Sequence, residues 1–368
     1  MTTDQIYSLV NGVASQAIGS TAITAVDAST LVSLGNAVLS SSTNTEAFLN
    51  TLIQRVGRTV LRYREYRNKL RDMVVNDFEY GAILQKIKVQ MPAAVQDPAY
   101  SLTDGQSIDP WIVAKPAVDQ KLFVKRTPYM FHITIQQHTL KEAFLSAESM
   151  GAFIGIVFGE VRNAIEFALE NLGRVTIATG IAEASAREIK LVTEYNAAAG
   201  TSLTAASAVL NKDFLAYAVK RMNSARDHLE DMSASYNDGS LVTFTPKEDL
   251  RVRINSDFHR ALETVVQYAA FHDEFVENEG VYSLMNFWQS EQSPLAVNIT
   301  RPSDSTDISI DNIVAVMHDR DALGMYQIDE DVQTTRINER GLYYNVFYHE
   351  RQLWFVDRSE NLVFFTLN

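Results

Sequence analysis

Residues 150–172 read MGAFIGIVFGEVRNAIEFALENL, and the architecture of the whole chain follows from them. Apolar side chains recur there every three or four residues, which is the spacing of one buried helix face. The periodicity extends both ways and predicts one long helical element from Thr139 to Gly180. We expect a capping box of Thr139 and Glu142 at its start, a glycine stop at Gly180, and a short first piece ending near Ser146 or Ser149. At 1.5 Å per residue this element would span roughly 60 Å, longer than a compact domain usually needs.

Three glycines stand at four-residue intervals within this helix: Gly151, Gly155 and Gly159. Each glycine costs about 1 kcal/mol of helix stability relative to alanine, so the stripe predicts that another element packs closely on bare backbone. The same spacing is typical of membrane helix dimers. The apolar run here is bounded by Glu148 and Glu160, however, and is too short to cross a bilayer.

The composition excludes several classes of protein. A net charge of -13 over 368 residues argues against a nucleic-acid binder that relies on counterion release. The absence of cysteine excludes disulfides, thiol catalysis and cysteine-ligated metals. The first residues lack a basic region followed by an apolar run, so we expect no signal peptide and synthesis inside a cell.

The N-terminal region combines a polar arm with a basic helix. Residues 1–42 are rich in Ser, Thr, Ala and Asn, and we expect them to order only by lying on another surface. A firmer helix starts near Thr43 and then becomes basic, at Arg55, Arg58, Arg62, Arg64, Arg67, Lys69 and Arg71. Two interpretations stay open: a solvated helix face, or a contact with carboxylates of another subunit. The densest acidic cluster is formed by Asp273, Glu274, Glu277 and Glu279.

Residues 79–134 have the pattern of extended structure. Alternation over 86–91 predicts one strand, and 120–125 followed by 130–135 predict its return. The connection over 92–116 is long and carries three apolar side chains, Tyr100, Trp111 and Ile112. Loops of this length are usually functional or disordered, so we predict a protruding hairpin that docks on a neighbour.

The second half of the chain mixes helices and strands. We predict a helix capped by Asn211 and running through Leu229, an alternating strand over 251–255, and a helix from Asp257 to about Phe275. The apolar run 313–317 predicts a central strand. Strands over 331–337 and 342–349 follow, joined by a turn at 338–341. We expect 350–352 to separate the latter from a strand over 353–356, and a strand over 362–367 comes last.

Catalytic and metal-binding motifs are missing. There is no GxxxxGK[ST] loop, no GxGxxG after a strand and no HExxH pair. The segment His318-Asp319-Arg320-Asp321 is interpreted as a turn between strands. The adjacent residues His272, Asp273 and Glu274 cannot all face one ion from a helix. We therefore predict no catalytic residue, no cofactor-binding residue and no metal ligand.

The order of these parts resembles the tailed-bacteriophage major capsid proteins, whose fold is shared with cellular nanocompartment shells. The resemblance is carried by IVAVMHDRDALG at 313–324, FTPKEDL at 244–250, and QIYSLVN at 5–11 with VSLG at 32–35. It covers essentially the whole chain and rests on layout and short strings.

The resemblance implies an α+β capsid fold with six segments. These are an N-terminal arm and basic helix (1–78), an extended hairpin loop (79–134), the spine helix of a peripheral domain (135–185), an axial domain (186–312), the strands of the peripheral domain (313–358) and a C-terminal strand (359–368).

The resemblance also implies a function. Such proteins form hexamers and pentamers of an icosahedral head that encloses double-stranded DNA. Separate scaffolding and portal proteins, and in some cases decoration proteins, would be its partners. Assembly would take place in the bacterial cytoplasm, without a membrane, and the finished protein would reside in the virion.

Two alternatives to a virus shell remain at this point. A nanocompartment shell would enclose an enzyme cargo, although the long arm over 1–78 favours the virus. An enzyme that uses a carboxylate pair within 186–312 would show metal-dependent hydrolysis.

Overall fold

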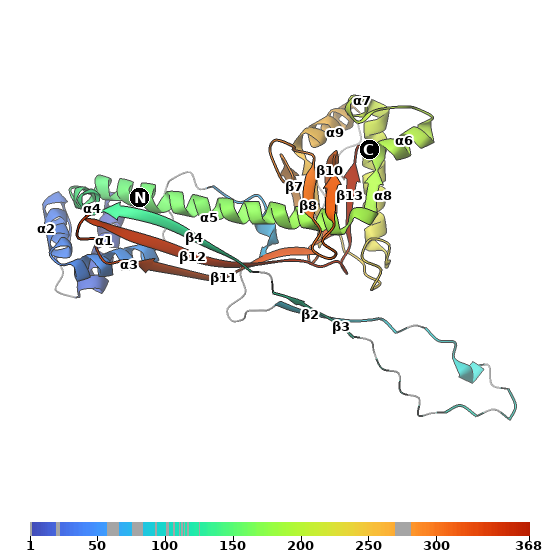
Figure 1. The fold of residues 1–368 in the computed structure, drawn as a ribbon, viewed down its shortest axis with the longest axis horizontal. Helices are drawn as coiled ribbons and strands as arrows, with labels where there is room; N and C mark the ends of the chain where they lie inside the picture. Colours follow the sequence, from blue (N-terminus) through green and yellow to red (C-terminus); the bar gives the residue numbers. More distant parts are fainter. Residues whose placement is uncertain are drawn as a thin grey trace. The chain divides into compact units, whose positions relative to one another are not determined.

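A computed structural model describes residues 2–19, 23–56, 66–75, 84–92, 94–100, 103–105, 107–109, 111, 113, 115, 118–124, 126–268 and 281–368. The chain divides into two compact units (Figure 1). The first unit comprises Met1–Tyr80, Arg126–Gly173 and Met325–Leu353, and the second comprises Gly81–Lys125, Arg174–Gly324 and Trp354–Asn368.

Three N-terminal helices belong to the first unit: α1 (Thr3–Ile18), α2 (Ala28–Leu39) and α3 (Ser42–Val56). Capping boxes start α1 at Thr2 and α2 at Asp27. Their apolar faces share one core with Phe144, Met150 and other residues of the first unit. The surface on which the arm lies is thus part of the same chain.

The spine is divided into α4 (Gln137–Ala143) and α5 (Ala147–Glu183), which confirms the predicted short first piece. The predicted capping box at Thr139 is wrong, because Gln136 is the N-cap and makes no side-chain cap. The amide of Gln137 instead donates to the carbonyl of Leu342 at 2.9 Å. The first residue of α4 is thus held by Leu342, the residue that precedes the strand Tyr343–Val356.

The predicted stop at Gly180 is also wrong, since α5 continues to Glu183. A Cβ atom at Gly180 would lie 2.8 Å from Cδ2 of Leu323 and 3.1 Å from Cδ1 of Leu362. This glycine therefore allows close packing within the helix and does not end it.

The four-stranded sheet of β1 (Val74–Val75), β11 (Leu323–Thr334), β12 (Tyr343–Val356) and β4 (Arg126–Gln136) has the order β1-β11-β12-β4. β12 pairs antiparallel with β4. The predicted break at 350–352 is wrong, because β12 runs through it. The buried carboxylate of Glu350 accepts hydrogen bonds from Nε2 of Gln327 at 2.8 Å and of Gln352 at 2.9 Å. Buried polar residues with partners continue a strand as well as apolar ones do.

The second unit contains a five-stranded sheet in the order β5-β13-β10-β6-β7. Its strands are β5 (Glu188–Lys190), β13 (Leu362–Thr366), β10 (Ile313–Asp319), β6 (Leu250–Asn255) and β7 (Val281–Met285). The prediction that 313–317 is a central strand is confirmed, and every residue of β10 is buried. The predicted strand over 251–255 is confirmed as β6, although both of its faces are largely buried. A boundary at 313 would divide this sheet, because β10 pairs with both β6 and β13.

The second unit contains the end of α5 and four further described helices: α6 (Leu191–Ala199), α7 (Ala205–Ala208), α8 (Lys212–Glu230) and α9 (Ser256–Tyr268). The cap at Asn211 is confirmed, since its Oδ1 accepts the amides of Asp213 and Phe214. The predicted end of α9 near Phe275 lies outside the described residues. Short elements complete the described chain: η1 (Arg71–Met73), η2 (Pro98–Tyr100), η3 (Ser185–Arg187), β8 (Val297–Thr300) and β9 (Asp307–Ile310).

The predicted hairpin consists of β2 (Leu84–Val89) and β3 (Val118–Phe123), which pair antiparallel. Residues 130–135, expected to extend the return strand, belong to β4 and pair with β12. Hereafter "the hairpin" means β2 and β3, and "the hairpin loop" means residues 90–117 between them.

Candidate assembly surfaces

The hairpin presents its apolar face to solvent. Ile87 and Val89 on β2, with Val118 and Leu122 on β3, are each more than half exposed. The alternate positions, which include Lys86, Lys88 and Lys121, are partly buried. A two-sided ribbon normally buries the apolar side and solvates the charged one. The periodicity of two in the sequence predicted the strands but not which face is covered.

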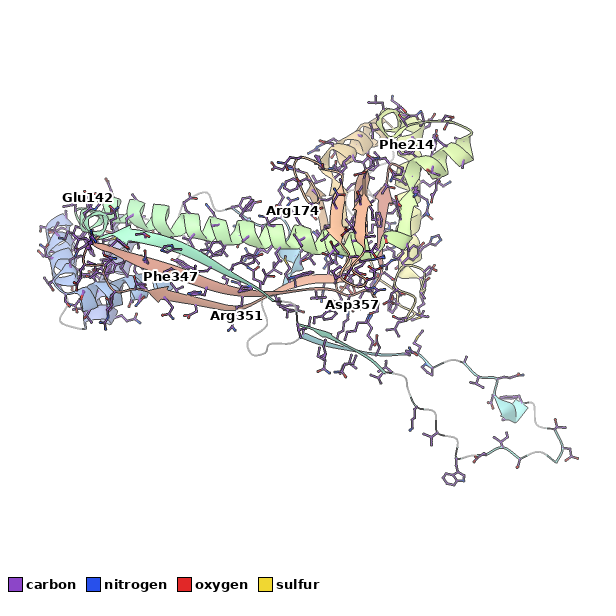
Figure 2. All side chains as sticks on the ribbon, viewed as in Figure 1. Glu142, Arg174, Phe214, Phe347, Arg351 and Asp357 are labelled. Carbon is purple, nitrogen blue, oxygen red and sulfur yellow. The ribbon has the colours of Figure 1, made fainter. Side chains whose placement is uncertain are left out.

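Carboxylates explain why the lysines face inward. Nζ of Lys86 lies 2.9 Å from Oδ2 of Asp357, and Nζ of Lys121 lies 3.0 Å from its Oδ1. Glu360 contacts both Lys86 and Lys88. Figure 2 labels Asp357 beside the hairpin strands. No individual sequence signal marked this cluster, because its carboxylates stand more than 230 positions from the lysines.

The charges in this cluster stabilise one another. Burial opposes ionisation of Asp357, but the charge and hydrogen bond of Lys86 and the hydrogen bonds of Ser359 lower its pKa to about 2. Burial also opposes the charge of Lys86, and Asp357 and Glu360 more than offset this, so the pKa of Lys86 is raised. Both groups are therefore ionised at neutral pH.

A groove of about 420 Å³ lies beside the start of the hairpin loop. Val89 and Met91 line one side of it, and Met232, Val242 and Phe244 line another. All five side chains are substantially exposed. Clusters of exposed apolar side chains on a protein are typical of contacts with other proteins.

The hairpin loop carries the most exposed aromatic side chains of the described chain. Tyr100 is 92% exposed and Trp111 is 85% exposed, while Ile112 lies outside the described residues. Val95 and Val113 are also strongly exposed. In the described part of this loop, the predicted contact residues thus have no core of their own.

Most of the predicted charged contact residues cannot be placed. Arg55 lies in α3, but its side chain is outside the described residues, as are Arg58, Arg62 and Arg64 entirely. The acidic cluster of Asp273, Glu274, Glu277 and Glu279 is outside them as well. No proximity of the two groups is therefore established.

The end of the basic segment is tied to α5 by acidic and amide side chains that the sequence analysis missed. Oδ1 of Asn163 accepts the amide of Tyr66 at 3.0 Å, and Oε2 of Glu170 accepts that of Lys69 at 3.3 Å. The hydroxyl of Tyr66 also donates to Glu170. The sequence shows that these acceptors are spaced by whole helical turns along α5. It does not show which residues would donate hydrogen bonds to them.

The glycines of the predicted stripe have different surroundings. A Cβ atom at Gly151 would lie 2.9 Å from Cδ1 of Ile6 in α1, whereas one at Gly159 would meet nothing within 4 Å. Gly155 is buried. The tightest described approach of two elements at a glycine in the N-terminal helices is at Gly35, where a Cβ would lie 2.6 Å from Cβ and Cγ of Phe144.

A turn follows β10 as predicted, but it lies at 320–322, because His318 and Asp319 are the last residues of the strand; the amide of Ala322 donates to the carbonyl of Asp319 at 3.0 Å. The Asp319 carboxylate accepts the Thr245 hydroxyl at 2.9 Å, and its burial raises the pKa. Among described residues, no group of three or more histidine or acidic side chains could hold a metal ion. In the same residues, no helix has the length and hydropathy needed to span a bilayer.

Comparisons with known proteins agree on one family. The family model described as Phi29-like phage major capsid protein matches residues 9–366. The major capsid protein of Bacillus phage B103 is 22% identical over 363 residues, 98% of this chain and 72% of that protein. That of Bacillus phage PZA is 22% identical over 342 residues, 92% of this chain and 67% of the relative.

Solved structures agree on the fold. A capsid structure of Staphylococcus phage Andhra has a TM-score of 0.53 at 10% identity, covering 84% of this chain and 87% of that one. A chain from native bacteriophage P68 has a TM-score of 0.52 at 12% identity, with the same coverages. The mixed helix and sheet architecture described above is thus that of tailed-phage capsids.

Proposed function

Because the chain belongs to the Phi29-like phage major capsid protein family, we propose that it closes into hexamers and pentamers that tile an icosahedral head around double-stranded DNA. It is a structural major capsid protein of the phage virion. The nanocompartment alternative is not favoured, since the matched family and its relatives are phage capsid proteins.

The observation that carries the proposal is the combination of an outward apolar hairpin face with exposed aromatic residues on the hairpin loop. Both surfaces expose apolar side chains to solvent in a single chain. Burial of apolar area is the main favourable term in the free energy of association. A protruding element that docks on a different surface of the next copy makes a head-to-tail contact, which closes into a ring when the rotation permits. The groove beside Met91 and Phe244 is a candidate surface for this contact.

The finer assignments follow from the same proposal. Separate scaffolding and portal proteins, and in some phages decoration proteins, act with the shell, which forms in the bacterial cytoplasm. The net charge of -13 suits a container that encloses DNA without binding specific sequences. The protein has no catalytic role, and a purified sample is expected to show no metal-dependent hydrolysis.

Negative-stain electron microscopy of the purified protein tests the proposal. We expect capsomers or closed shells from the unaltered chain, and loss of shells after Tyr100→Ala with Trp111→Ala. Leu210→Ala is the matched control, because Leu210 is 85% exposed like Trp111 but lies outside the hairpin. Normal shells from the double variant would contradict the role of the hairpin loop, and a persistently monomeric parent protein would contradict the proposed function itself.

A further inference from the structure

The two strands of the hairpin oppose each other electrostatically at one position. Lys86 and Lys121 are direct cross-strand partners in the β2–β3 register. Side chains at such positions start from Cβ atoms about 4.5–5.5 Å apart, and like charges directly opposite one another destabilise the pairing. The hairpin therefore needs an anion at this point.

A single carboxylate supplies that anion to both strands. Oδ2 of Asp357 lies 2.9 Å from Lys86, and Oδ1 lies 3.0 Å from Lys121. Asp357 is only 3% exposed, so solvent screens these contacts little. Glu360 adds contacts to Lys86 and Lys88, and Asp238 lies 3.8 Å from Lys121, which gives three cations facing three carboxylates.

The position of Asp357 is itself fixed by the second unit. Its amide donates to the carbonyl of Ala322 at 2.7 Å, and Oδ1 accepts the amide and hydroxyl of Ser359 at 3.0 and 2.7 Å. Direct contacts between the hairpin and the rest of this unit also include Phe123, whose ring centroid is 5.0 Å from that of Phe355. The carboxylate is thus held in place by contacts that do not involve the lysines.

We propose that Asp357 is a positioning residue for capsid assembly: it neutralises the Lys86–Lys121 pair and thereby fixes the direction of the hairpin, with its lysines inward and its apolar face outward. This inference rests on the proposed function for the role of the hairpin in assembly. Loss of the carboxylate removes the one anion shared by Lys86 and Lys121, leaves Glu360 and Asp238 at the edges of the pair, and weakens the attachment of the hairpin to the rest of the second unit.

The chain has no cysteine, which permits site-specific spin labels without background. Spin labels are attached to cysteines introduced by Gln120→Cys in β3 and Asp227→Cys in α8. Pulsed electron paramagnetic resonance of the unassembled protein then measures the distribution of distances between the two labels, which reports the direction of the hairpin. We expect one narrow distance distribution in the parent and at least a twofold broader one after Asp357→Asn. Asp304→Asn is the control, because Asp304 pairs with Arg301 in the same unit but far along the chain from the hairpin, and it should leave the distribution unchanged.

A rescue experiment separates charge neutralisation from general loss of structure. Adding Lys86→Met and Lys121→Met to Asp357→Asn removes the repulsion, and the distribution should narrow again. The two lysine changes alone leave the buried Asp357 carboxylate without its lysine partners. We expect the distance distribution of this double variant to be broader than that of the triple variant, and this comparison holds even where Asp357→Asn folds poorly. An unchanged distribution in Asp357→Asn, or no narrowing in the triple variant, would overturn the inference.

Microscopy of the same samples keeps the two hypotheses apart. If the parent protein forms shells and the distance distribution is unchanged in Asp357→Asn, the positioning role of Asp357 is contradicted and the proposed function stands. A released hairpin in Asp357→Asn, with no shells from the parent protein, would remove the proposed function and leave the positioning role of Asp357 in the folded subunit.

Discussion

Gly35 in α2 packs against the base of the Phe144 side chain, where no flexible end can move aside. A Cβ atom there would lie 2.6 Å from Cβ of Phe144, whereas one at Gly159 would meet no atom within 4 Å. We expect Gly35→Ala to lower the free energy of unfolding by about 1–3 kcal/mol through overpacking. Gly159→Ala should raise it by up to about 1 kcal/mol through helix propensity. Urea unfolding of the unassembled subunit measures both, and equal effects would contradict the packing described at Gly35.

The Asp357 carboxylate makes the free energy of unfolding depend on pH between about pH 4 and pH 2. Its pKa is about 2 in the folded protein against an ordinary 3.8. A lowered pKa means that the stabilisation is fully present above about pH 4 and is lost as the pH falls towards 2. We expect Asp357→Asn to cost on the order of 2 kcal/mol at pH 6 and progressively less below pH 4. Unfolding curves of parent and variant at several pH values test this; a constant difference from pH 6 to pH 2.5 would be inconsistent with it.

Individual residues show where sequence reasoning ended. The cap at Asn211 was predictable because its partners are the amides of Asp213 and Phe214, two and three positions away. The roles of Gly180 and Glu350 could not be predicted, because no local sequence pattern identifies their partners Leu323 and Gln327. Gly180 therefore looked like a stop, and Glu350 looked like a strand break.

Among elements, the segment Tyr66–Leu70 depends on α5 for its placement. Glu170 is buried and accepts the amide of Lys69 and the hydroxyl of Tyr66. We expect Glu170→Ala to increase the exchange rate of the Lys69 amide at least tenfold, because the amide then loses the hydrogen-bond acceptor that protects it from exchange. Glu160→Ala, an exposed position on the same helix, is the control and should leave that rate unchanged. Unaltered protection in Glu170→Ala would show that other contacts hold this segment.

The elements themselves were largely predictable from periodicity. The long helix and the hairpin strands followed from spacings of 3.6 and 2, and the central strand β10 followed from a short, continuously apolar run. Which face of the hairpin is covered did not follow, because an alternating strand reads the same whichever side is buried. That choice is made by Asp357 and Glu360, far along the chain.

For the whole molecule, the hairpin loop should distinguish assembled from free subunits. Its described aromatic residues, Tyr100 and Trp111, have no core to bury them in a single chain. We expect limited proteolysis to cut within 92–116 in free subunits and to be at least tenfold slower there in shells, because docking would cover the loop. Equal cleavage rates in both states would mean that this loop is not an assembly contact.

The basic helix gives a second prediction about assembly. We expect Arg58→Glu with Arg62→Glu to abolish even empty, DNA-free particles, because a cationic face in a chain of net charge -13 is suited to carboxylates of a neighbouring subunit. Reversing Asp273, Glu274 and Glu277 to lysine should partly restore assembly. Microscopy of particles made without DNA measures this. Normal empty shells that fail to retain DNA would instead assign the basic face to the genome.

The topology of the five-stranded sheet constrains how the subunit is made. β5 at Glu188–Lys190 pairs with β13 at Leu362–Thr366, and β10 must fit between β13 and β6. Pairings so distant in sequence form slowly, whereas the N-terminal helices are local and form early. A growing chain therefore passes through a stage in which this sheet is incomplete until residues 362–366 have been made. Chains whose synthesis stops before that point lack β13 and cannot complete the sheet. Such truncated chains therefore lack a folded second unit and are not incorporated into a growing shell.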